Sequence, residues 1–439
     1  MDSSWSAAGL FVVGLAGIQA LLTVVQTWEH HRFARSRLAN VWRCRAHGRA
    51  AILVPCRGLD CEMEKNLEGL FGQDYPDYEV WFILEAATDP AYAAVNRVMA
   101  AHPERVTRLI LAGRAQEGGQ KVHNLRVATA LLPPEITYLA FLDADARPST
   151  CWLRVLLARL DRGEVGAATG YRWFVPRRAS LANHLLYAIN AGLTMFCSRG
   201  GPNAVWGGSW AIRRDLFQRL EIREAWNGAL SDDFVATWAL YRAGLHIEFQ
   251  PACVVASPLD VSLPAMCSFV RRQYIIGRSY FLPAWLLGAT VLSLANLAFW
   301  GGLAAAAWGL LGGPIDPRMP AGIVGLVYAG CVLRGLLRGD LARRYLPDQQ
   351  PSLRQARLFD LWSGPLVGLF TWAMMAASLF GSRITWRGIT YRLRPGGKVQ
   401  TISREEAGSA GSSREEAGSL RVFRGDEEPV DESANLHAA

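Results

Sequence analysis

Residues 138–147 read Tyr-Leu-Ala-Phe-Leu-Asp-Ala-Asp-Ala-Arg, an apolar run that ends in two carboxylates. A short apolar run that stops at a polar loop is typical of a buried strand. Side chains of an extended chain alternate between its two sides, so Asp143 and Asp145 can face one point where that strand ends. Two such carboxylates suit a hard divalent cation, Mg²⁺ or Mn²⁺. The alternative interpretation is a solvated turn that caps a helix.

Three further apolar runs precede this strand, and helical patterns separate them. Repeated alternation of strand and helix predicts an α/β fold, with a mixed, mostly parallel sheet and helices on both faces. Ligands of such sheets bind beyond the carboxyl ends of the strands, which here places the loops beginning at Pro55, Glu85 and Asp143 on one rim. The predicted strands are 51–54, 80–84, 107–111 and 138–142.

Long apolar stretches flank this α/β region. Residues 9–27 contain no charged residue and are about as long as a bilayer-crossing helix must be. Six arginines follow between positions 32 and 49, which by the positive-inside rule places the next domain in the cytoplasm. The other apolar stretches are 281–313, 321–338 and most of 361–382.

Four parts are therefore predicted. Residues 7–28 form an N-terminal transmembrane helix, and residues 50–280 form a cytoplasmic α/β domain. Residues 281–382 hold two to four membrane segments. Residues 383–439 form a cytoplasmic basic segment and an acidic tail, in which Ser-Arg-Glu-Glu-Ala-Gly-Ser occurs twice and disorder is expected from residue 400.

Composition narrows the class of protein. Of the 439 residues, 51% are hydrophobic and 19% are charged, against about 25% charged in an average soluble chain. This disfavours a purely soluble enzyme and excludes a mostly disordered chain. The net charge is +8, and a basic chain with apolar spans is expected to meet anionic lipid headgroups. Nucleic acid is not an expected partner, because no basic stripe alternates with aromatic residues.

Two more features of the composition bear on the compartment. The eight cysteines form no Cys-x-x-Cys pair and have no histidine at zinc-ligand spacing, so reduced, scattered thiols are expected. Only three of the 46 basic residues are lysines, a bias associated with bacterial genomes rich in G and C. The expected location is the bacterial inner membrane, with the α/β domain in the cytoplasm.

Two further motifs carry chemistry within the α/β region. Residues 206–213 read Trp-Gly-Gly-Ser-Trp-Ala-Ile-Arg, in which Gly207 and Gly208 would let a ligand approach the backbone closely, unless they form an ordinary strand turn. Residues 230–237 read Leu-Ser-Asp-Asp-Phe-Val-Ala-Thr and open a helical pattern. One residue of this motif would cap the helix, which leaves a carboxylate free to act as a general base. The alternative is that its acidic residues serve the helix end alone.

A fourth motif, Phe-Val-Arg-Arg-Gln-Tyr at 269–274, lies just before the first C-terminal apolar stretch. Its arginines could bind a diphosphate bidentately. The alternative is that they contact lipid headgroups beside a membrane span.

In order and spacing, these motifs resemble the membrane-bound family-2 glycosyltransferases over about residues 50–280. Within that group the sequence is most similar to the ceramide glucosyltransferase-like branch. Three local matches support the resemblance: Pro-Cys-Arg-Gly-Leu-Asp at 55–60 followed by Asn-Leu at 66–67, Asp-Tyr-Pro-Asp-Tyr-Glu-Val at 74–80, and Gln-Lys-Val-His-Asn-Leu at 120–125.

The resemblance implies the GT-A nucleotide-diphosphosugar fold, a UDP-sugar donor and inversion at the anomeric carbon. It assigns Asp143 and Asp145 to the metal, Asp233 to the catalytic base and Asp232 to the position beside it. The expected donor contacts are Arg57, Asp60, Glu85, Lys121 and Asp143. Glu85 departs from the family pattern, because Ala86 occupies the usual aspartate position. Expected acceptor and gating residues are Gly207, Gly208, Trp210, Arg271, Arg272, Gln273 and Tyr274, although the family box ends in Arg-Trp where this chain has Gln273-Tyr274.

The expected acceptor is a hydroxyl of a membrane lipid of the ceramide, hopanoid or glycerolipid type. The amphipathic run 181–196 could lie on the bilayer surface, or it could be a buried core helix. Two other functions stay open: a processive polysaccharide synthase, which would need more spans, and a non-catalytic membrane scaffold. The sequence specifies neither the sugar nor the lipid.

Overall fold

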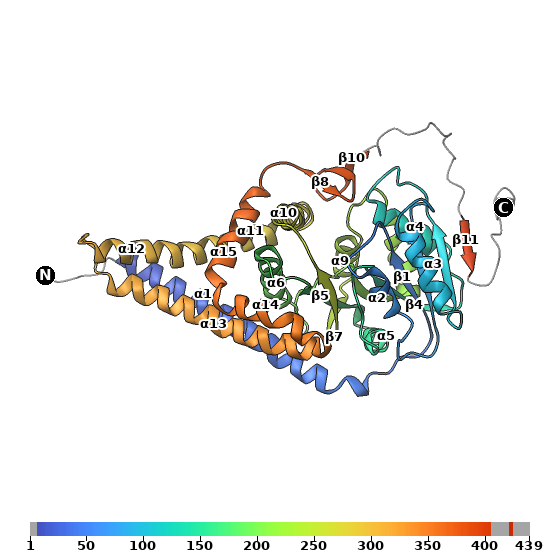
Figure 1. Ribbon diagram of the computed structural model, residues 1–439, viewed down its shortest axis with the longest axis horizontal. Helices are drawn as coiled ribbons and strands as arrows, with labels where there is room; N and C mark the ends of the chain where they lie inside the picture. Colours follow the sequence, from blue (N-terminus) through green and yellow to red (C-terminus); the bar gives the residue numbers. More distant parts are fainter. Residues whose placement is uncertain (1–6, 405–420, 425–439) are drawn as a thin grey trace. The chain divides into compact units, whose positions relative to one another are not determined.

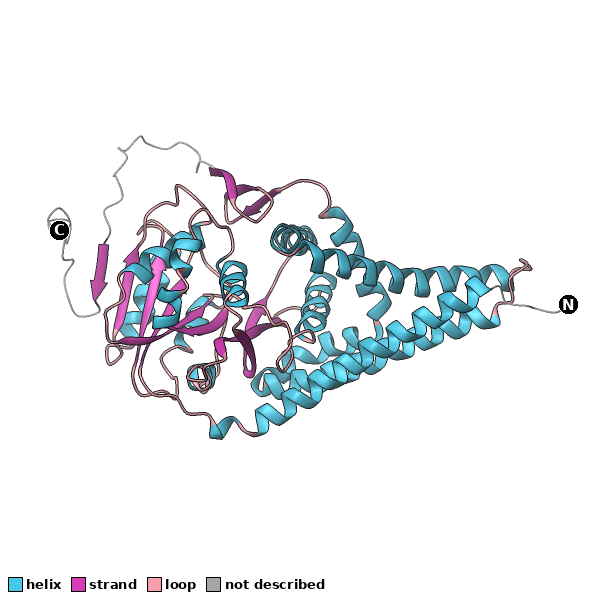
Figure 2. Cartoon of the chain, turned by 180° about the vertical axis from the view of Figure 1, so that it is seen from behind, coloured by secondary structure: helices cyan, strands magenta, loops and turns pink. Residues whose placement is uncertain are grey.

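The computed structural model describes residues 7–404 and 421–424. The described chain forms two compact units, which we name by their content. The sheet unit comprises residues 37–172, 198–258 and the described residues from 382 onward. The helical unit comprises the described residues up to 36, 173–197 and 259–381. Figure 2 shows that most strands belong to the first and most long helices to the second.

The sheet has eight strands in the order β11-β3-β2-β1-β4-β6-β5-β7 (Figure 1). Strands β3, β2, β1 and β4 run parallel, whereas β6 is antiparallel to both β4 and β5. The strand bounds are β1 Arg49–Pro55, β2 Tyr78–Leu84, β3 Thr107–Leu111, β4 Ile136–Leu142, β5 Val165–Pro176, β6 Ser209–Arg213, β7 His246–Leu259 and β11 Arg421–Arg424. All four strands predicted from the sequence are thus confirmed, each at or within the observed bounds.

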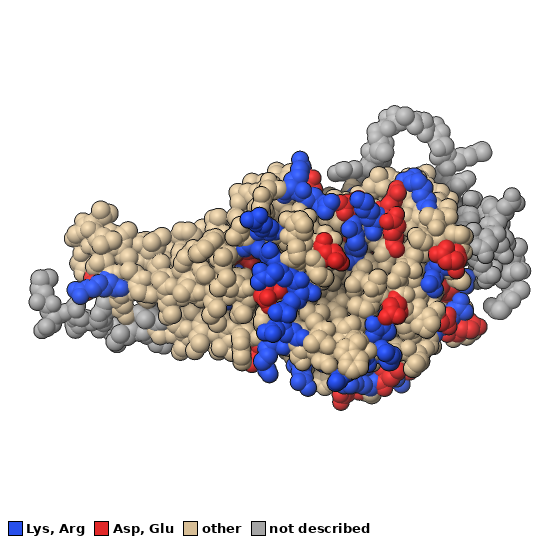
Figure 3. Space-filling view, turned by 60° about the horizontal axis from the view of Figure 1, so that its bottom comes forward, with Lys and Arg blue, Asp and Glu red and all other residues tan. Residues whose placement is uncertain are grey.

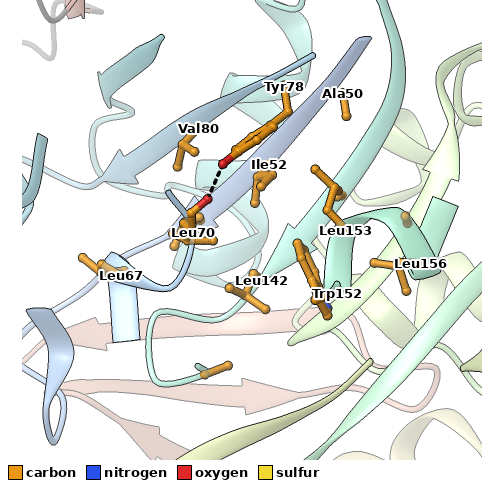
Figure 4. Close-up of a cluster of buried hydrophobic side chains, with 14 of the residues drawn as sticks. Ala50, Ile52, Leu67, Leu70, Tyr78, Val80, Leu142, Trp152, Leu153 and Leu156 are labelled. Atoms are coloured by element: carbon orange, nitrogen blue, oxygen red, sulfur yellow. Dashed lines mark hydrogen bonds between the residues drawn. The ribbon is translucent and has the colours of Figure 1, made fainter. Parts of the chain in front are cut away.

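Helices cover both faces of the sheet because the central strands are apolar on both sides. In β1, Ile52 and Val54 pack with residues of α2, α3 and α5, whereas Ala51 and Leu53 pack with residues of α4 and α9. Figure 4 shows part of the first cluster, in which Tyr78 donates a hydrogen bond to the carbonyl of Leu70. The helix bounds are α2 Met63–Glu68, α3 Ala91–Ala101, α4 Gln120–Ala130, α5 Trp152–Leu157, α7 Arg214–Arg219, α8 Ile222–Ala225 and α9 Asp232–Arg242.

The helical unit contains two helices that are long and apolar enough to cross a membrane, 282–310 and 318–345. The first is one continuous rod, because α11 (Leu282–Asn296) passes through a π-helical turn at 297–301 into α12 (Gly302–Leu310). The second is α13 (Arg318–Tyr345). By contrast, α15 (Gly364–Ala377) has 14 residues and is only about 21 Å long, short of a bilayer's hydrocarbon core. The remaining helices are α1 Ala7–Ala39, α6 Leu181–Thr194, α10 Leu263–Tyr280 and α14 Gln350–Trp362.

The run 181–196, predicted to lie on the bilayer surface or to be a buried core helix, forms α6 in the helical unit. Leu185, Leu186 and Ile189 are buried against Met266 and Val270 of α10. The helix is therefore a core element of this unit, as the alternative interpretation had it.

The C-terminal segment requires a correction. Strands β8 (Arg383–Trp386), β9 (Ile389–Leu393) and β10 (Val399–Arg404) form a three-stranded antiparallel sheet, which we call the C-terminal meander. Strand β11 pairs with the edge strand β3. The prediction of disorder from residue 400 is wrong for residues 400–404 and 421–424, because their backbone pairs with partners distant in sequence. The rest of the predicted tail lies outside the described residues.

The contribution of the hydrophobic core to stability can be tested at Trp210. Its ring is fully buried and stacks on Phe141 of the neighbouring strand, with ring centroids 4.2 Å apart. Trp210→Ala should lower the free energy of unfolding by about 3–5 kcal/mol, since it leaves a large cavity. Thermal unfolding should show a clearly lower Tm. Trp42→Ala is the matched control, because Trp42 is 63% exposed and its truncation should leave the Tm nearly unchanged.

Candidate active site

The Asp-x-Asp motif lies directly after β4, as predicted, and an arginine bridges its two carboxylates. Arg172 places one guanidinium nitrogen 3.1 Å from Oδ2 of Asp143 and the other 3.1 Å from Oδ2 of Asp145. Arg172 projects from β5 and is half-buried. The sequence analysis missed it. The available signal was an arginine within the otherwise apolar strand segment around Gly170 and Trp173.

Lys121, at the first turn of α4, connects this motif to the acidic pair. Its Nζ lies 2.8 Å from Oδ1 of Asp143 and 3.3 Å from Oδ1 of Asp232, and it donates a hydrogen bond to the carbonyl of Gly207. Burial opposes the charged form of Lys121, but Asp143, Asp232 and Asp233 together raise its pKa above the usual value. Lys121 therefore stays a cation at the centre of the site.

The acidic pair opens helix α9, and Ser231 is the N-cap, with its side chain accepting a hydrogen bond from the Phe234 amide. Asp233 accepts hydrogen bonds through one oxygen from that amide, at 2.8 Å, and from the Ser231 hydroxyl. Its other oxygen accepts one from the Gly207 amide at 3.0 Å. The capping interpretation is thus correct for Ser231, and the acidic pair also reaches the glycine loop.

Asp232 differs from its neighbour in burial. It is 3% exposed, and its Oδ2 has no hydrogen-bond partner among the described residues. Burial raises the pKa of Asp232 to about 7, Lys121 opposes the shift, and Asp233 and Asp143 add to it. Asp233 is only half-buried, so it is the more accessible carboxylate of the two.

The two glycines lie where the carboxylates converge. A Cβ on Gly207 would lie 3.0 Å from Oδ2 of Asp232 and from Nζ of Lys121. A Cβ on Gly208 would lie 2.7 Å from Oδ2 of Asp143 and 2.3 Å from the ring of Trp206. Only glycine fits this close approach of the loop to the carboxylates.

The tryptophan of this motif that lies at the site is not the one predicted there. Trp210, predicted at the site, lies in the core of the sheet unit. Trp206 instead lies beside the carboxylates, with the guanidinium of Arg172 4.8 Å from its ring centroid. The sequence does not distinguish the two, because both flank the same glycine pair.

The expected donor loop follows β1. Arg57 forms an ion pair with Glu85, which also accepts a hydrogen bond from Arg404 at 2.7 Å. Asp60 forms an ion pair with Arg387 of the C-terminal meander. Burial raises the pKa of Asp60 to about 6, with the charge of Asp145 adding to the shift and that of Arg387 opposing it. The expected donor residues Arg57, Asp60 and Glu85 thus each have a partner.

The last predicted group lies on α10 in the helical unit. Arg271 donates hydrogen bonds to the carbonyls of Ala377 and Phe380 after α15. Arg272 lies over the ring of Phe269 and Tyr274 packs into the core of this unit, whereas Gln273 is exposed. These four residues therefore belong to a different unit from the carboxylates.

The carboxylate cluster has the charge to hold a divalent cation. Within the part of the chain that the structure describes, the cations that form ion pairs with Asp143, Asp145 and Asp232 are Lys121 and Arg172. Two buried oxygens, Oδ1 of Asp145 and Oδ2 of Asp232, lack hydrogen-bond partners within the described residues. No group of three or more His, Cys, Asp or Glu ligands is found there, however. The site thus fits a cation bound by two carboxylates, with further oxygens from substrate or water, as Mg²⁺ is commonly held.

Comparison with known families identifies the class of protein. The model of the family described as Glycosyl transferase family 21 matches residues 12–399. The chain therefore belongs to glycosyl transferase family 21 and is a glycosyltransferase. This confirms the resemblance to the ceramide glucosyltransferase-like branch and gives no support to a non-catalytic scaffold.

A curated relative and several solved structures illustrate what the chain is similar to. Ceramide glucosyltransferase of Komagataella phaffii is 34% identical over 59 residues, which are 13% of this chain and only 12% of the relative. A mannosyltransferase from Pyrobaculum calidifontis, in complex with GDP-Man and Mn²⁺, is 16% identical, with a TM-score of 0.43 over 83% of this chain and 97% of its own.

The other two structures are more remote. GalNAc-T7 with UDP, GalNAc and Mn²⁺ is 11% identical, with a TM-score of 0.37 over 53% of this chain and 50% of its own. TarS 1-349 of S. aureus is 11% identical, with a TM-score of 0.35 over 80% of this chain and 98% of its own. All three TM-scores are below 0.5, so none of these similarities bears on substrate or residue roles in this chain.

Proposed function

We propose that this protein transfers a sugar from a UDP-sugar to a hydroxyl of a membrane lipid, with inversion at the anomeric carbon and with Mg²⁺ or Mn²⁺. The observation that supports it most is the convergence of Lys121, the Asp-x-Asp motif and the acidic pair around two glycines, in a chain of glycosyl transferase family 21. The lipid is of the ceramide, hopanoid or glycerolipid type.

Each residue has a proposed role in one displacement. Asp233 takes the proton of the acceptor hydroxyl as that oxygen attacks the anomeric carbon, because it is the accessible carboxylate and the Gly207 amide orients it. Lys121 and Arg172 stabilise negative charge on the departing diphosphate. Asp143 and Asp145 would hold the divalent cation, which supplies further stabilisation of that charge. Arg57, Asp60 and Glu85 bind the nucleotide end of the donor.

Features of the helical unit support a membrane acceptor. In Figure 3 its long helices present a surface almost without charge, which ends at a band of basic side chains. Arginines in the last turns of α1 and α13 favour the cytoplasmic leaflet. We therefore propose that α1 and the helices 282–310 and 318–345 span a bacterial inner membrane, with the sheet unit in the cytoplasm. On α10, Arg271, Arg272, Gln273 and Tyr274 are proposed to gate acceptor entry or product release.

The function is tested by supplying membranes that contain the protein with labelled UDP-glucose, UDP-galactose, UDP-N-acetylglucosamine and UDP-glucuronate, with Mn²⁺ and total lipid. Label is expected in the organic phase. Chelation by EDTA should reduce transfer to the background of empty membranes, and added Mn²⁺ should restore it. Without the cation, Asp143 and Asp145 would add negative charge beside the diphosphate and not neutralise it.

Other outcomes of this assay would contradict the proposal. Label in an insoluble polymer would identify a polysaccharide synthase instead. Transfer that persists unchanged in EDTA would overturn the role of the cation, and label in neither fraction would overturn the choice of donor and acceptor.

A further inference from the structure

The C-terminal meander contacts the loops that surround the carboxylate cluster, although more than 160 residues separate them in sequence. The Tyr391 hydroxyl accepts a hydrogen bond from the Gln120 amide, next to Lys121. On the far side, the Gly397 carbonyl accepts one from Leu230, and the Val399 amide donates one to the Gly228 carbonyl, just before the acidic pair. The meander is therefore fixed at both sides of the site within the sheet unit.

Arg387 lies at the tip of the β8–β9 hairpin in an unusual backbone conformation. Trp386 pairs with Ile389, so Arg387 and Gly388 form a two-residue turn with φ values of 48° and 72°. Such turns favour Asn-Gly or Gly-Gly, and a non-glycine residue at positive φ is strained. An arginine at this strained position points to a role for its side chain.

The side chain of Arg387 reaches the loop after β1. Its guanidinium contacts the Asp60 carboxylate and the Arg57 carbonyl. Gly58 makes room for it, since a Cβ there would lie 2.9 Å from the guanidinium. Gly58 also has a φ of 59°, which favours glycine. The loop after β1 and the tip of the β8–β9 hairpin are thus complementary in shape and charge.

The position of Arg387 matches the chemistry of a diphosphate. Asp60, its partner, lies two residues before Glu62, which forms an ion pair at 2.7 Å with Arg147, itself two residues after Asp145. The guanidinium therefore lies on the loop that contacts the Asp-x-Asp motif. Guanidinium groups bind phosphate oxygens through two parallel hydrogen bonds.

We propose that Arg387 is a donor-binding residue, which the C-terminal meander brings to the diphosphate of the nucleotide-sugar. This inference rests on the proposed function and adds a residue from outside the α/β domain to its donor site. Asp60 holds the guanidinium in place before the donor binds.

Arg387→Gly is the sharpest test, because glycine removes the guanidinium while relieving the positive φ of the turn. The purified full-length protein would be titrated calorimetrically with UDP, GDP and uridine in the presence of Mn²⁺. UDP affinity should fall about tenfold to a hundredfold, as expected for a charge-assisted hydrogen-bond pair. Binding of uridine, which has no phosphate, should change less than twofold.

Arg392→Ala is the matched control, since Arg392 lies on β9 of the same meander and is exposed. It should retain wild-type affinity. The Tm of Arg387→Gly should stay close to that of the wild type, because relief of the positive φ offsets the lost ion pair with Asp60. Equal UDP affinity of Arg387→Gly and wild type, or tighter binding by the variant, would overturn the inference about Arg387 and leave the proposed function standing. A wild-type protein that binds neither UDP nor GDP would instead refute the proposed function.

Discussion

Asp233→Asn is expected to lower the rate of sugar transfer by about 10²- to 10⁴-fold, the usual contribution of a general base. An asparagine amide keeps the size of the side chain and one acceptor for the Gly207 or Phe234 amide, but it cannot take a proton. UDP affinity should change less than threefold, because the proposed role lies in chemistry and not in donor binding. Single-turnover transfer to lipid, measured beside UDP titration, separates the two effects.

A matched control for this variant is Asp215→Asn. Asp215 also lies in the first turn of a helix, α7, but its side chain is exposed and pairs only with Arg213. Transfer by this control should stay near the wild-type rate. If Asp233→Asn kept a tenth or more of the activity while Asp232→Asn abolished it, the base would be Asp232 and our assignment would be wrong.

Gly208→Ala should reduce transfer by about 10²-fold or more and should also lower the Tm. The added methyl group would overlap the ring of Trp206 and press on Asp143, so one of the two must move. Trp206 packs against Arg172, which bridges Asp143 and Asp145. A displacement of Trp206 would therefore also move the carboxylates of the Asp-x-Asp motif. A shift of about 1 Å in a catalytic group commonly costs this much in rate.

Gly72→Ala provides the comparison for a methyl group added without steric consequence. Nothing lies within 4 Å of a Cβ at Gly72. Its transfer rate and Tm should match those of the wild type. Wild-type activity in Gly208→Ala would mean that the loop is not held against Asp143 during the reaction.

The sequence predicted the parts of this fold that depend on local pattern. The four strands before the Asp-x-Asp motif are apolar runs bounded by polar loops, so their existence could be inferred, whereas their order in the sheet could not. The sequence was less informative about β5, β6 and β7. Strand β6 is antiparallel to both β4 and β5, and β7 pairs with β5 although many residues separate them. Their register depends on packing, such as the stacking of Trp210 on Phe141, and not on periodicity.

The candidate site divides in the same way. Four residues of the site were found because each lies within a recognisable motif: Lys121, Asp143, Asp232 and Asp233. Arg172 was missed because strand β5 has no motif of its own and brings it to the carboxylates only through tertiary structure. Arg387 was missed because it lies in a hairpin turn more than 300 residues from Asp60, which it contacts. The composition of the tail, rich in Gly, Ser and Glu, also concealed that residues 400–404 could complete a sheet.

The C-terminal meander also constrains how the chain is threaded through a bilayer. Strand β7, where the chain leaves the sheet unit, and strand β8, where it returns, are built into the same unit. In the proposed membrane arrangement, the polypeptide between them therefore re-emerges on the side from which it departed, after an even number of crossings. Helices 282–310 and 318–345 would supply two crossings, and the 14-residue α15 would turn back on the side where it began. A glycosylation or cysteine-labelling tag placed in the 311–317 turn should thus report the opposite compartment from one placed after residue 404.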